Sequence, residues 1–324
     1  MASPRHAPLS TCTVAAVNFA PVDDDKHATV EKMIDNVREA GRQGADLVVF
    51  PENAIPGPED CTCREVGGPC PAHLEDAETI PGPMTDAVQK VAHEFDLYVC
   101  FGMAEADADD PSVLYKAAAV VGPDGALGSY RKVHLGTLPW VTEGITYRPG
   151  DSLPVFPTRF GGIGVQICYD FWFNPELTRI LALKGAQLIV NCAGSFEAPG
   201  RKDTMTATAV ARAAENLVYT VTSNSTGGPG DANRYSGSEL TSSKRASVFT
   251  GNSLITGPAF PRFGEVLAQA GDMEEIVFAT LSGDRLARWD AVFPWPEWRR
   301  GRLKGASELI AREFTDALSE PETS

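Results

Sequence analysis

The stretch GIGVQICYDFWFNPELTRILALKGAQLIVN, residues 162–191, contains two short apolar runs on either side of a segment with helical spacing. Gly162–Cys168 and Ala186–Asn191 are predicted to be strands, and Pro175–Lys184 is predicted to be a helix. Both runs are apolar at nearly every position, which is typical of strands that are covered on both faces. The stretch therefore predicts a strand–helix–strand unit of an α/β protein.

The same alternation extends along most of the chain. Predicted strands cover residues 13–18, 45–50, 97–103, 114–121, 127–132 and 218–223, and predicted helices cover residues 28–43, 84–95 and 204–216. Gly44 is a typical residue for closing the first of these helices. Because no linker, internal repeat or low-complexity block interrupts the pattern, we expect one α/β domain with well-covered sheets.

The composition excludes several classes of protein. The chain has 324 residues with a formal net charge of -15, which argues against nucleic acid or an anionic membrane surface as the main partner. It contains no apolar run long enough for a membrane span and no secretory signal, so a cytoplasmic location is expected. The 7 cysteines are scattered, which is typical of free thiols in a reducing compartment. Residues 1–10 and 316–324 are expected to be loose ends.

Three polar residues, Glu52, Lys132 and Cys168, stand at the ends of predicted strands. Ligands of open α/β sheets bind at strand ends. Taken singly, each residue has an ordinary interpretation as a turn carboxylate, a surface charge or a small buried side chain. Their sequence contexts are more specific than the residues themselves.

These contexts resemble the nitrilase superfamily of carbon–nitrogen hydrolases. The segments similar to the motifs of that family are VVFPE (residues 48–52), YRKVHL (130–135), GVQICYD (164–170), ARAAEN (211–216) with Asn224, and TGNS (250–253). The resemblance extends from about residue 11 to residue 282. It implies a single-domain, four-layer α-β-β-α sandwich, with a hydrolase domain over residues 11–285 and a C-terminal extension over residues 286–324.

The resemblance also implies a set of catalytic roles. Cys168 is expected to be the nucleophile, and Glu52 is expected to accept its proton and return it to the leaving ammonia or amine. Lys132 and the backbone N–H after Cys168 are expected to stabilise the oxyanion, and a thioester follows. Glu143 is expected to orient Lys132 or the substrate nitrogen, although an ordinary loop carboxylate is the alternative. His134 is expected to be structural, and no cofactor is implied.

The residues after the nucleophile bear on the substrate. Tyr169 and Asp170 resemble the amidase and carbamoylase branches, so a small amide or N-carbamoyl compound is expected, with nitrile hydrolysis as the alternative. Tyr169, Trp172 and Asn191 are expected to bind the substrate. Relatives that act on ω-amides of dicarboxylic acids often carry an arginine at or beside position 172, where this chain has the aromatic run of residues 171–173. The departure from that pattern favours an apolar, aromatic or cationic substrate group. Phe171 and Phe173 themselves are expected to pack in the core.

Two further segments stand out. Cys61, Cys63, Cys70 and His73 could form a Cys₃His zinc site, but their spacing matches no familiar pattern. The prediction is therefore an entrance loop with free thiols and no metal. The segment at residues 289–300 has three tryptophans and is interrupted by two prolines. We expect it to be irregular and to pack at a subunit boundary of a homodimer or larger oligomer.

Other functions of the same chemistry fit this chain less well. A glutamine-amide donor module would be expected to continue into a synthetase domain, and an acyltransferase of this type would be expected to have membrane spans. A binding protein without catalytic activity would have no reason to retain Glu52, Lys132 and Cys168 together.

Overall fold

Two six-stranded sheets form the centre of the protein. The computed structural model describes residues 8–22, 25–55, 61–136, 143–227, 249–258, 260–292 and 294–319. The first sheet has the order β14 (Glu275–Leu281), β1 (Cys12–Asn18), β2 (Leu47–Val49), β3 (Tyr98–Ala106), β4 (Leu114–Gly122), β5 (Gly125–Arg131). The second has the order β13 (Glu265–Gln269), β12 (Leu254–Gly257), β9 (Tyr219–Asn224), β8 (Leu188–Ala193), β7 (Gly161–Ile167), β6 (Val155–Thr158).

Each sheet has a parallel centre, because β1, β2 and β3 pair in parallel, as do β7, β8 and β9. Their carboxyl ends therefore lie on one edge of each sheet, where Glu52 and Cys168 follow β2 and β7. A small third sheet pairs β10 (Thr226–Gly227) with β11 (Phe249–Thr250).

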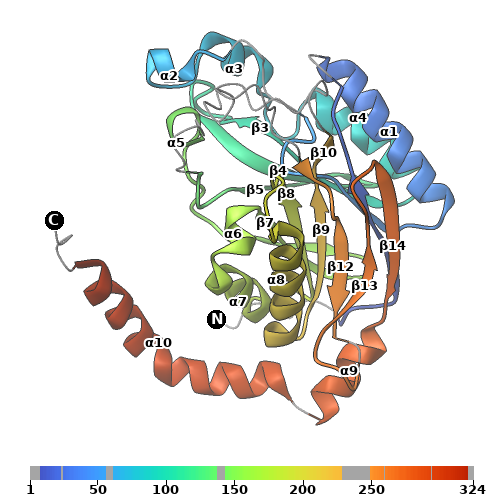
Figure 1. Ribbon diagram of the computed structural model, residues 1–324, viewed down its shortest axis with the longest axis vertical. Coiled ribbons are helices and arrows are strands. Elements are labelled where there is room, and N and C mark those ends of the chain that lie inside the picture. Colours follow the sequence, from blue (N-terminus) through green and yellow to red (C-terminus); the bar gives the residue numbers. More distant parts are fainter. Residues whose placement is uncertain are drawn as a thin grey trace.

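Helices cover the outer face of each sheet (Figure 1). On the first sheet, α1 (Lys26–Arg42) and α4 (Pro83–Glu94) bury one apolar side each, with Val30 and Val88 among the buried residues. The Asp25 side chain caps α1, and Gly44 follows its end with a φ of +80°. The outer face of the second sheet is covered by α7 (Pro175–Leu183) and α8 (Arg201–Asn216). The four-layer α-β-β-α arrangement is thus the one expected.

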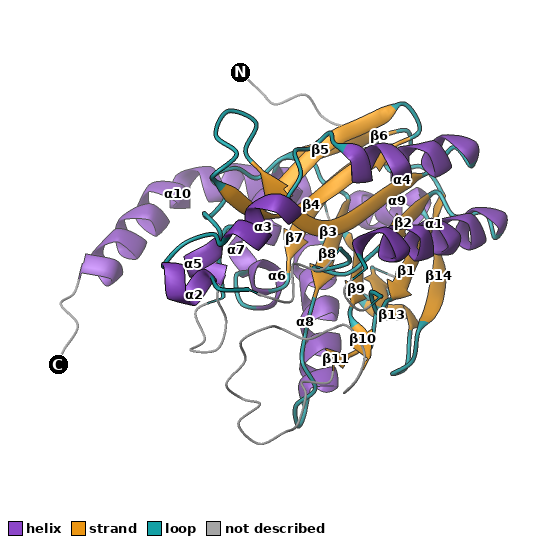
Figure 2. Ribbon diagram, turned by 90° about the horizontal axis from the view of Figure 1, so that it is seen from above, coloured by secondary structure: helices purple, strands orange, loops and turns teal. Residues whose placement is uncertain are grey.

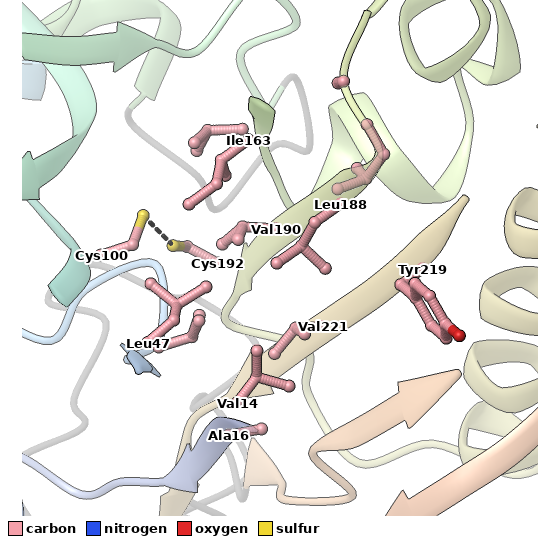
Figure 3. Packing of buried hydrophobic residues seen from close by; sticks show 14 of the residues in the cluster. Val14, Ala16, Leu47, Cys100, Ile163, Leu188, Val190, Cys192, Tyr219 and Val221 are labelled. Atoms are coloured by element: carbon pink, nitrogen blue, oxygen red, sulfur yellow. Dashed lines mark hydrogen bonds between the residues drawn. The ribbon is translucent and has the colours of Figure 1, made fainter. Parts of the chain in front are cut away.

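The inner faces of the two sheets share one hydrophobic core (Figure 3). Val14 and Leu47 of the first sheet and Val190 and Val221 of the second are fully or almost fully inaccessible to solvent. Burying a side chain of this size stabilises the fold by about 1.5–3 kcal/mol. A second core lies between the first sheet and its helices, so these strands are buried on both faces. This explains why the predicted strands are apolar without alternation.

The predicted elements are confirmed with boundaries that differ by a few residues. The structure adds short helices in segments without helical periodicity, namely α2 (Cys63–Val66), α3 (Pro71–Asp76), α5 (Glu143–Thr146) and α6 (Tyr169–Trp172). At the N-terminal end Leu9 packs in the core, although residues 1–10 were expected to be loose. Residues 1–7 lie outside the described part of the chain.

The C-terminal segment differs from the prediction. It forms α9 (Gly283–Val292) and α10 (Trp295–Ser319), so residues 289–300 are largely helical and the helix continues into the predicted loose end. Pro294 falls between the helices and Pro296 in the first turn of α10, where a missing N–H is tolerated. Figure 1 shows α10 pointing away from the body. Of the helices described, none combines the length and hydropathy that a membrane span requires.

Candidate active site

Glu52 lies where the two sheets meet. Its backbone N–H donates to the carbonyl of Ala193 on β8, with an N···O distance of 3.4 Å, while the preceding carbonyl of Pro51 accepts from Gly102 on β3 at 3.0 Å. A Cβ atom at Gly102 would lie 1.7 Å from the Glu52 carbonyl oxygen, so only glycine permits this approach. These backbone hydrogen bonds to both sheets fix the position of Glu52, from which its side chain extends.

Cys168 occupies a sharp turn between β7 and α6. Its φ of 47° and ψ of -98° are unfavourable for a residue with a side chain, and such strain persists only where the surroundings hold it. Its N–H is shared by Asn191 Oδ1 and the Cys192 carbonyl, both at 3.0 Å. Its carbonyl accepts from the N–H of Trp172 at 2.9 Å, which begins α6. The turn presents the thiol at the end of the sheet.

Four charged side chains form a buried network beside this turn. Lys132 Nζ lies 2.6 Å from Glu52 Oε1 and 2.8 Å from Glu143 Oε2. Lys116 Nζ lies 2.5 Å from Glu143 Oε1 and 3.6 Å from Glu52 Oε1. Each of the four side chains is at most 5% exposed. Because two ammonium groups face two carboxylates, the charges compensate one another, as buried charges require.

The electrostatics of the network fix the charge states of Glu143 and Lys132. Burial opposes the charged form of Glu143, yet the Lys116 and Lys132 ammonium groups outweigh it and hold the pKa of that carboxyl well below its usual range. Burial also opposes the charge of Lys132, but Glu143 and Glu52 raise its pKa above the ordinary value. Both residues are therefore ionised at neutral pH.

The surroundings of the Cys168 thiol favour its neutral form, in contrast to Glu143 and Lys132, whose charged forms are favoured. Burial, and then the negative charge of Glu52, raise its pKa to about 12, although Lys132 lowers it in part. The thiol is therefore protonated at neutral pH. To act as a nucleophile it must lose its proton during attack, which requires a neighbouring base.

Asp170 connects the segment after Cys168 to the segment after Lys132. Its buried carboxylate accepts from the Tyr130 hydroxyl at 2.7 Å, the His134 backbone N–H at 2.8 Å and the Val133 backbone N–H at 3.2 Å. The His134 ring lies 2.9 Å from the same carboxylate. His134 thus has a structural contact, as expected, but through Asp170.

One pocket contains six of the seven predicted site residues. Its empty space, including the opening to solvent, is about 510 Å³. Its lining includes Glu52, Lys132, Glu143, Cys168, Tyr169 and Trp172. Residues from four different parts of the chain are thus brought together at one surface.

Two predictions for individual residues are not supported. Asn191 does not line the described pocket; it is fully buried and bonds to the Cys168 backbone and to the Thr222 hydroxyl. It supports the turn at Cys168 and does not face the substrate space. Phe171 is buried as expected, whereas Phe173 is 60% exposed and forms an edge-to-face pair with Tyr169, with 5.2 Å between ring centres.

The sequence analysis missed six residues of the site. Lys116 is a charged residue in an otherwise apolar strand, which could have drawn attention to it. No sequence pattern pointed to the other five, which line the pocket: Gly136, Gly194, Ser195, Phe196 and Arg201. The Gly194 N–H donates to the Cys168 sulfur. A Cβ atom at Gly194 would lie 3.1 Å from Glu52 Oε2, which is a tighter contact than usual.

The pocket also contains polar groups that are free to meet a substrate. Among the described residues, the buried Ser195 hydroxyl and Trp172 Nε1 have no hydrogen-bond partner. Because buried polar groups normally form hydrogen bonds, an acceptor on a bound molecule would supply the partner that these two groups lack. Arg201 adds a positive charge to the lining, which weighs against the cationic substrate group expected from the aromatic run.

Comparisons with known proteins show which family and fold the chain resembles. A family model described as carbon-nitrogen hydrolase matches residues 13–291. A nitrilase from Pyrococcus abyssi is 38% identical over 78% of this chain and 82% of its own length. The human omega-amidase NIT2 is 33% identical over 81% of this chain and 86% of its own length. The crystal structure of a carbon-nitrogen hydrolase from Helicobacter pylori G27 has a TM-score of 0.73 at 22% identity and covers 93% of this chain and 98% of its own.

Proposed function

Because the chain belongs to the carbon–nitrogen hydrolase family, we propose that it hydrolyses a small amide or N-carbamoyl compound through a thioester on Cys168. The observation that carries the proposal is the position of the Lys132 ammonium, 2.6 Å from Glu52 and 2.8 Å from Glu143, in the same pocket as the Cys168 thiol. This arrangement offers a base, a charge for an oxyanion and a nucleophile to one substrate.

In the first step, the Glu52 carboxylate accepts the thiol proton as the sulfur attacks the carbonyl carbon. A carbon–sulfur bond forms, and negative charge develops on the substrate oxygen. The Lys132 ammonium and the backbone N–H of Tyr169 stabilise that charge in a site from which most water is excluded. The pKa of about 12 for the Cys168 thiol makes the transfer of its proton to a base necessary at neutral pH.

In the second step, the tetrahedral species collapses and the carbon–nitrogen bond breaks. Glu52 returns the proton to the nitrogen, so ammonia or an amine leaves and the acyl group remains on Cys168 as a thioester. Glu52 then removes a proton from water, whose oxygen attacks the thioester carbon. The carbon–sulfur bond breaks, the acid departs, and the thiol regains its proton.

The polar lining favours an amide over a nitrile. An amide nitrogen carries hydrogens that the Glu52 and Glu143 carboxylates can accept, and an amide oxygen can accept from Lys132. A nitrile has a single acceptor and no donor, so it could not donate a hydrogen bond to either carboxylate. Nitrile hydrolysis is the second candidate, supported by the 38% identity to a protein named nitrilase.

We further propose that residues 11–285 form the catalytic domain and that residues 286–324 contact a second copy of the chain. Support comes from α10, which points away from the body and exposes Leu309, Ile310 and Phe314 by 49%, 42% and 58%. Apolar side chains in such a row gain stability when they are covered.

The test is ammonia release from a panel of amides, N-carbamoyl compounds and nitriles of matched size. We expect turnover of amides or carbamoyl compounds and a covalent acyl adduct on the wild-type chain in its intact mass. Cys168→Ala should abolish both, while its circular dichroism spectrum stays unchanged. Full activity of Cys168→Ala would disprove the mechanism, and hydrolysis of a nitrile without hydrolysis of its amide would favour the second candidate.

A further inference from the structure

Three cysteines and one histidine cluster in the helical segment that follows Glu52. Cys63 begins α2, Cys70 directly precedes α3, and His73 lies in its first turn. One side-chain donor atom from each of these residues and from Cys61 lies within 4.8 Å of all the others. None of the four lines the pocket described above.

Two distances within the cluster lie close to those of a tetrahedral metal site. Cys63 Sγ lies 3.4 Å and Cys70 Sγ 3.3 Å from the same nitrogen, His73 Nδ1. A zinc ion bound to sulfur and imidazole nitrogen holds neighbouring donor atoms about 3.5–3.8 Å apart. Hydrogen bonding alone explains the cluster poorly, because one ring nitrogen offers either one proton or one lone pair to two sulfurs.

Two of the sulfurs are buried and accept backbone hydrogen bonds. Cys63 and Cys70 are fully buried and His73 is 6% exposed, while Cys61 is partly exposed. The Cys70 backbone N–H donates to Cys63 Sγ at 3.2 Å, and the backbone N–H groups of Thr62 and His73 donate to Cys70 Sγ. Outer hydrogen bonds of this kind orient and stabilise metal-bound ligands.

The backbone brings the ligands together by a tight reversal after α2. Gly67 ends that helix with a φ of +69°, a conformation that glycine adopts readily, and its N–H bonds to the Cys63 carbonyl at 2.9 Å. The chain can then return so that Cys70 meets Cys63.

We propose that Cys61, Cys63, Cys70 and His73 bind one zinc ion per chain as a closed structural site. Three soft thiolates and one imidazole select zinc over oxygen-preferring cations. Four protein ligands leave no open coordination position, which is typical of structural and not of catalytic zinc. The proposal replaces the prediction of an entrance loop with free thiols and no metal.

The zinc site would stabilise α2 and α3, which support the part of the candidate active site that contains Glu143. The helices α2, α3 and α5 lie close together in Figures 1 and 2, and α2 contacts α5, which carries Glu143. The His73 ring packs edge-on against Tyr147, with 6.1 Å between ring centres. The Tyr147 ring in turn lies 5.9 Å from Lys116 Nζ. Only this consequence rests on the proposed function; metal binding does not.

The test is the metal content of the full chain, produced with zinc and dialysed against a weak chelator. We expect elemental analysis and native mass spectrometry to find one zinc per chain. Cys63→Ala and Cys70→Ala should lose it, whereas Cys12→Ala, which removes a buried thiol elsewhere, should retain it. Cys168→Ala should also retain it, which separates the cluster from the active-site thiol. Replacement by Co²⁺ should produce the visible absorption of a tetrahedral thiolate site.

A second variant covers the case in which loss of a ligand prevents folding. His73→Cys keeps four soft ligands and should fold with one zinc, while His73→Ala should bind it more weakly. Wild-type chain that is folded but takes up no zinc would overturn the proposal. So would a disulfide between two of the three thiols, or zinc that remains in Cys63→Ala but is lost from Cys168→Ala. These readouts use no substrate, so they are independent of the proposed hydrolysis.

Discussion

Replacing Glu52 by glutamine separates proton transfer from charge and packing. The substitution keeps the size of the side chain and leaves an oxygen that can accept from Lys132, now 2.6 Å from Glu52 Oε1. It removes the group that accepts the Cys168 proton in the proposed mechanism. We therefore expect a folded chain that binds substrate and turns it over very slowly.

The size of the expected losses in kcat and in stability can be estimated from the role and the contacts of Glu52. Loss of a positioned general base costs about 10²–10⁴ in kcat, or about 2.7–5.4 kcal/mol in the activation free energy. Stability should fall by about 1.5–3 kcal/mol, the contribution of a hydrogen bond to a charged group. The loss stays in this range because Lys132 keeps Glu143 at 2.8 Å and is not left unpaired.

The reactivity of the Cys168 thiol toward alkylation should increase in Glu52→Gln, whereas turnover should decrease. Glu52 is the second largest cause, after burial, that raises the pKa of Cys168 to about 12. Removing its charge should lower that pKa, so alkylation of Cys168 by iodoacetamide should reach its maximal rate at lower pH than in the wild type. The variant would thus have a more reactive thiol and a less active enzyme.

The assays are ammonia release for kcat and KM, and intact-mass measurement of alkylation over a pH series. Glu143→Gln is the matched control, since it removes the same charge from the same lysine without removing the proposed base. We expect a smaller loss of kcat from it. A Glu52→Gln variant within tenfold of wild-type kcat, or a thiol that titrates at higher pH, would refute the assignment of Glu52.

Three other changes test the supporting residues. Asn191→Ala should reduce the free energy of unfolding in urea by about 1–3 kcal/mol and lower kcat; unchanged values would show that the bond to the Cys168 N–H is dispensable. Because its folded pKa is depressed, Glu143 stabilises the fold above its unfolded pKa of about 4.3, and this contribution is lost as pH falls. The stability deficit of Glu143→Gln should therefore shrink below about pH 4, and a constant deficit would contradict the charge assignment. Arg201→Gln should reduce kcat/KM more for amides with a distal carboxylate than for uncharged amides, and equal losses would exclude a role in binding anions.

Much of the fold was predictable because its determinants are local. Apolar runs without alternation indicated strands covered on both faces, and helical spacing identified α1, α4, α7 and α8. The C-terminal helices were missed because the prolines and tryptophans at residues 289–300 suggested irregular chain, whereas both prolines occupy positions that helices tolerate. Phe171 and Phe173 have the same chemistry, and only the direction of α6 buries one and exposes the other.

The sequence by itself predicted catalytic roles for Glu52, Lys132, Cys168 and Glu143, since their flanking residues resemble family motifs and three of them stand at strand ends. Their convergence depends on contacts between segments far apart in the chain, such as the bond from Glu52 to β8 and the bonds from Asp170 to the segment after Lys132. The same holds for Lys116, Asn191, Arg201 and the thiol cluster, whose partners are decided by sheet order and loop packing. Local patterns report which side of an element is buried, whereas the distance between two side chains is set by the tertiary structure that joins them.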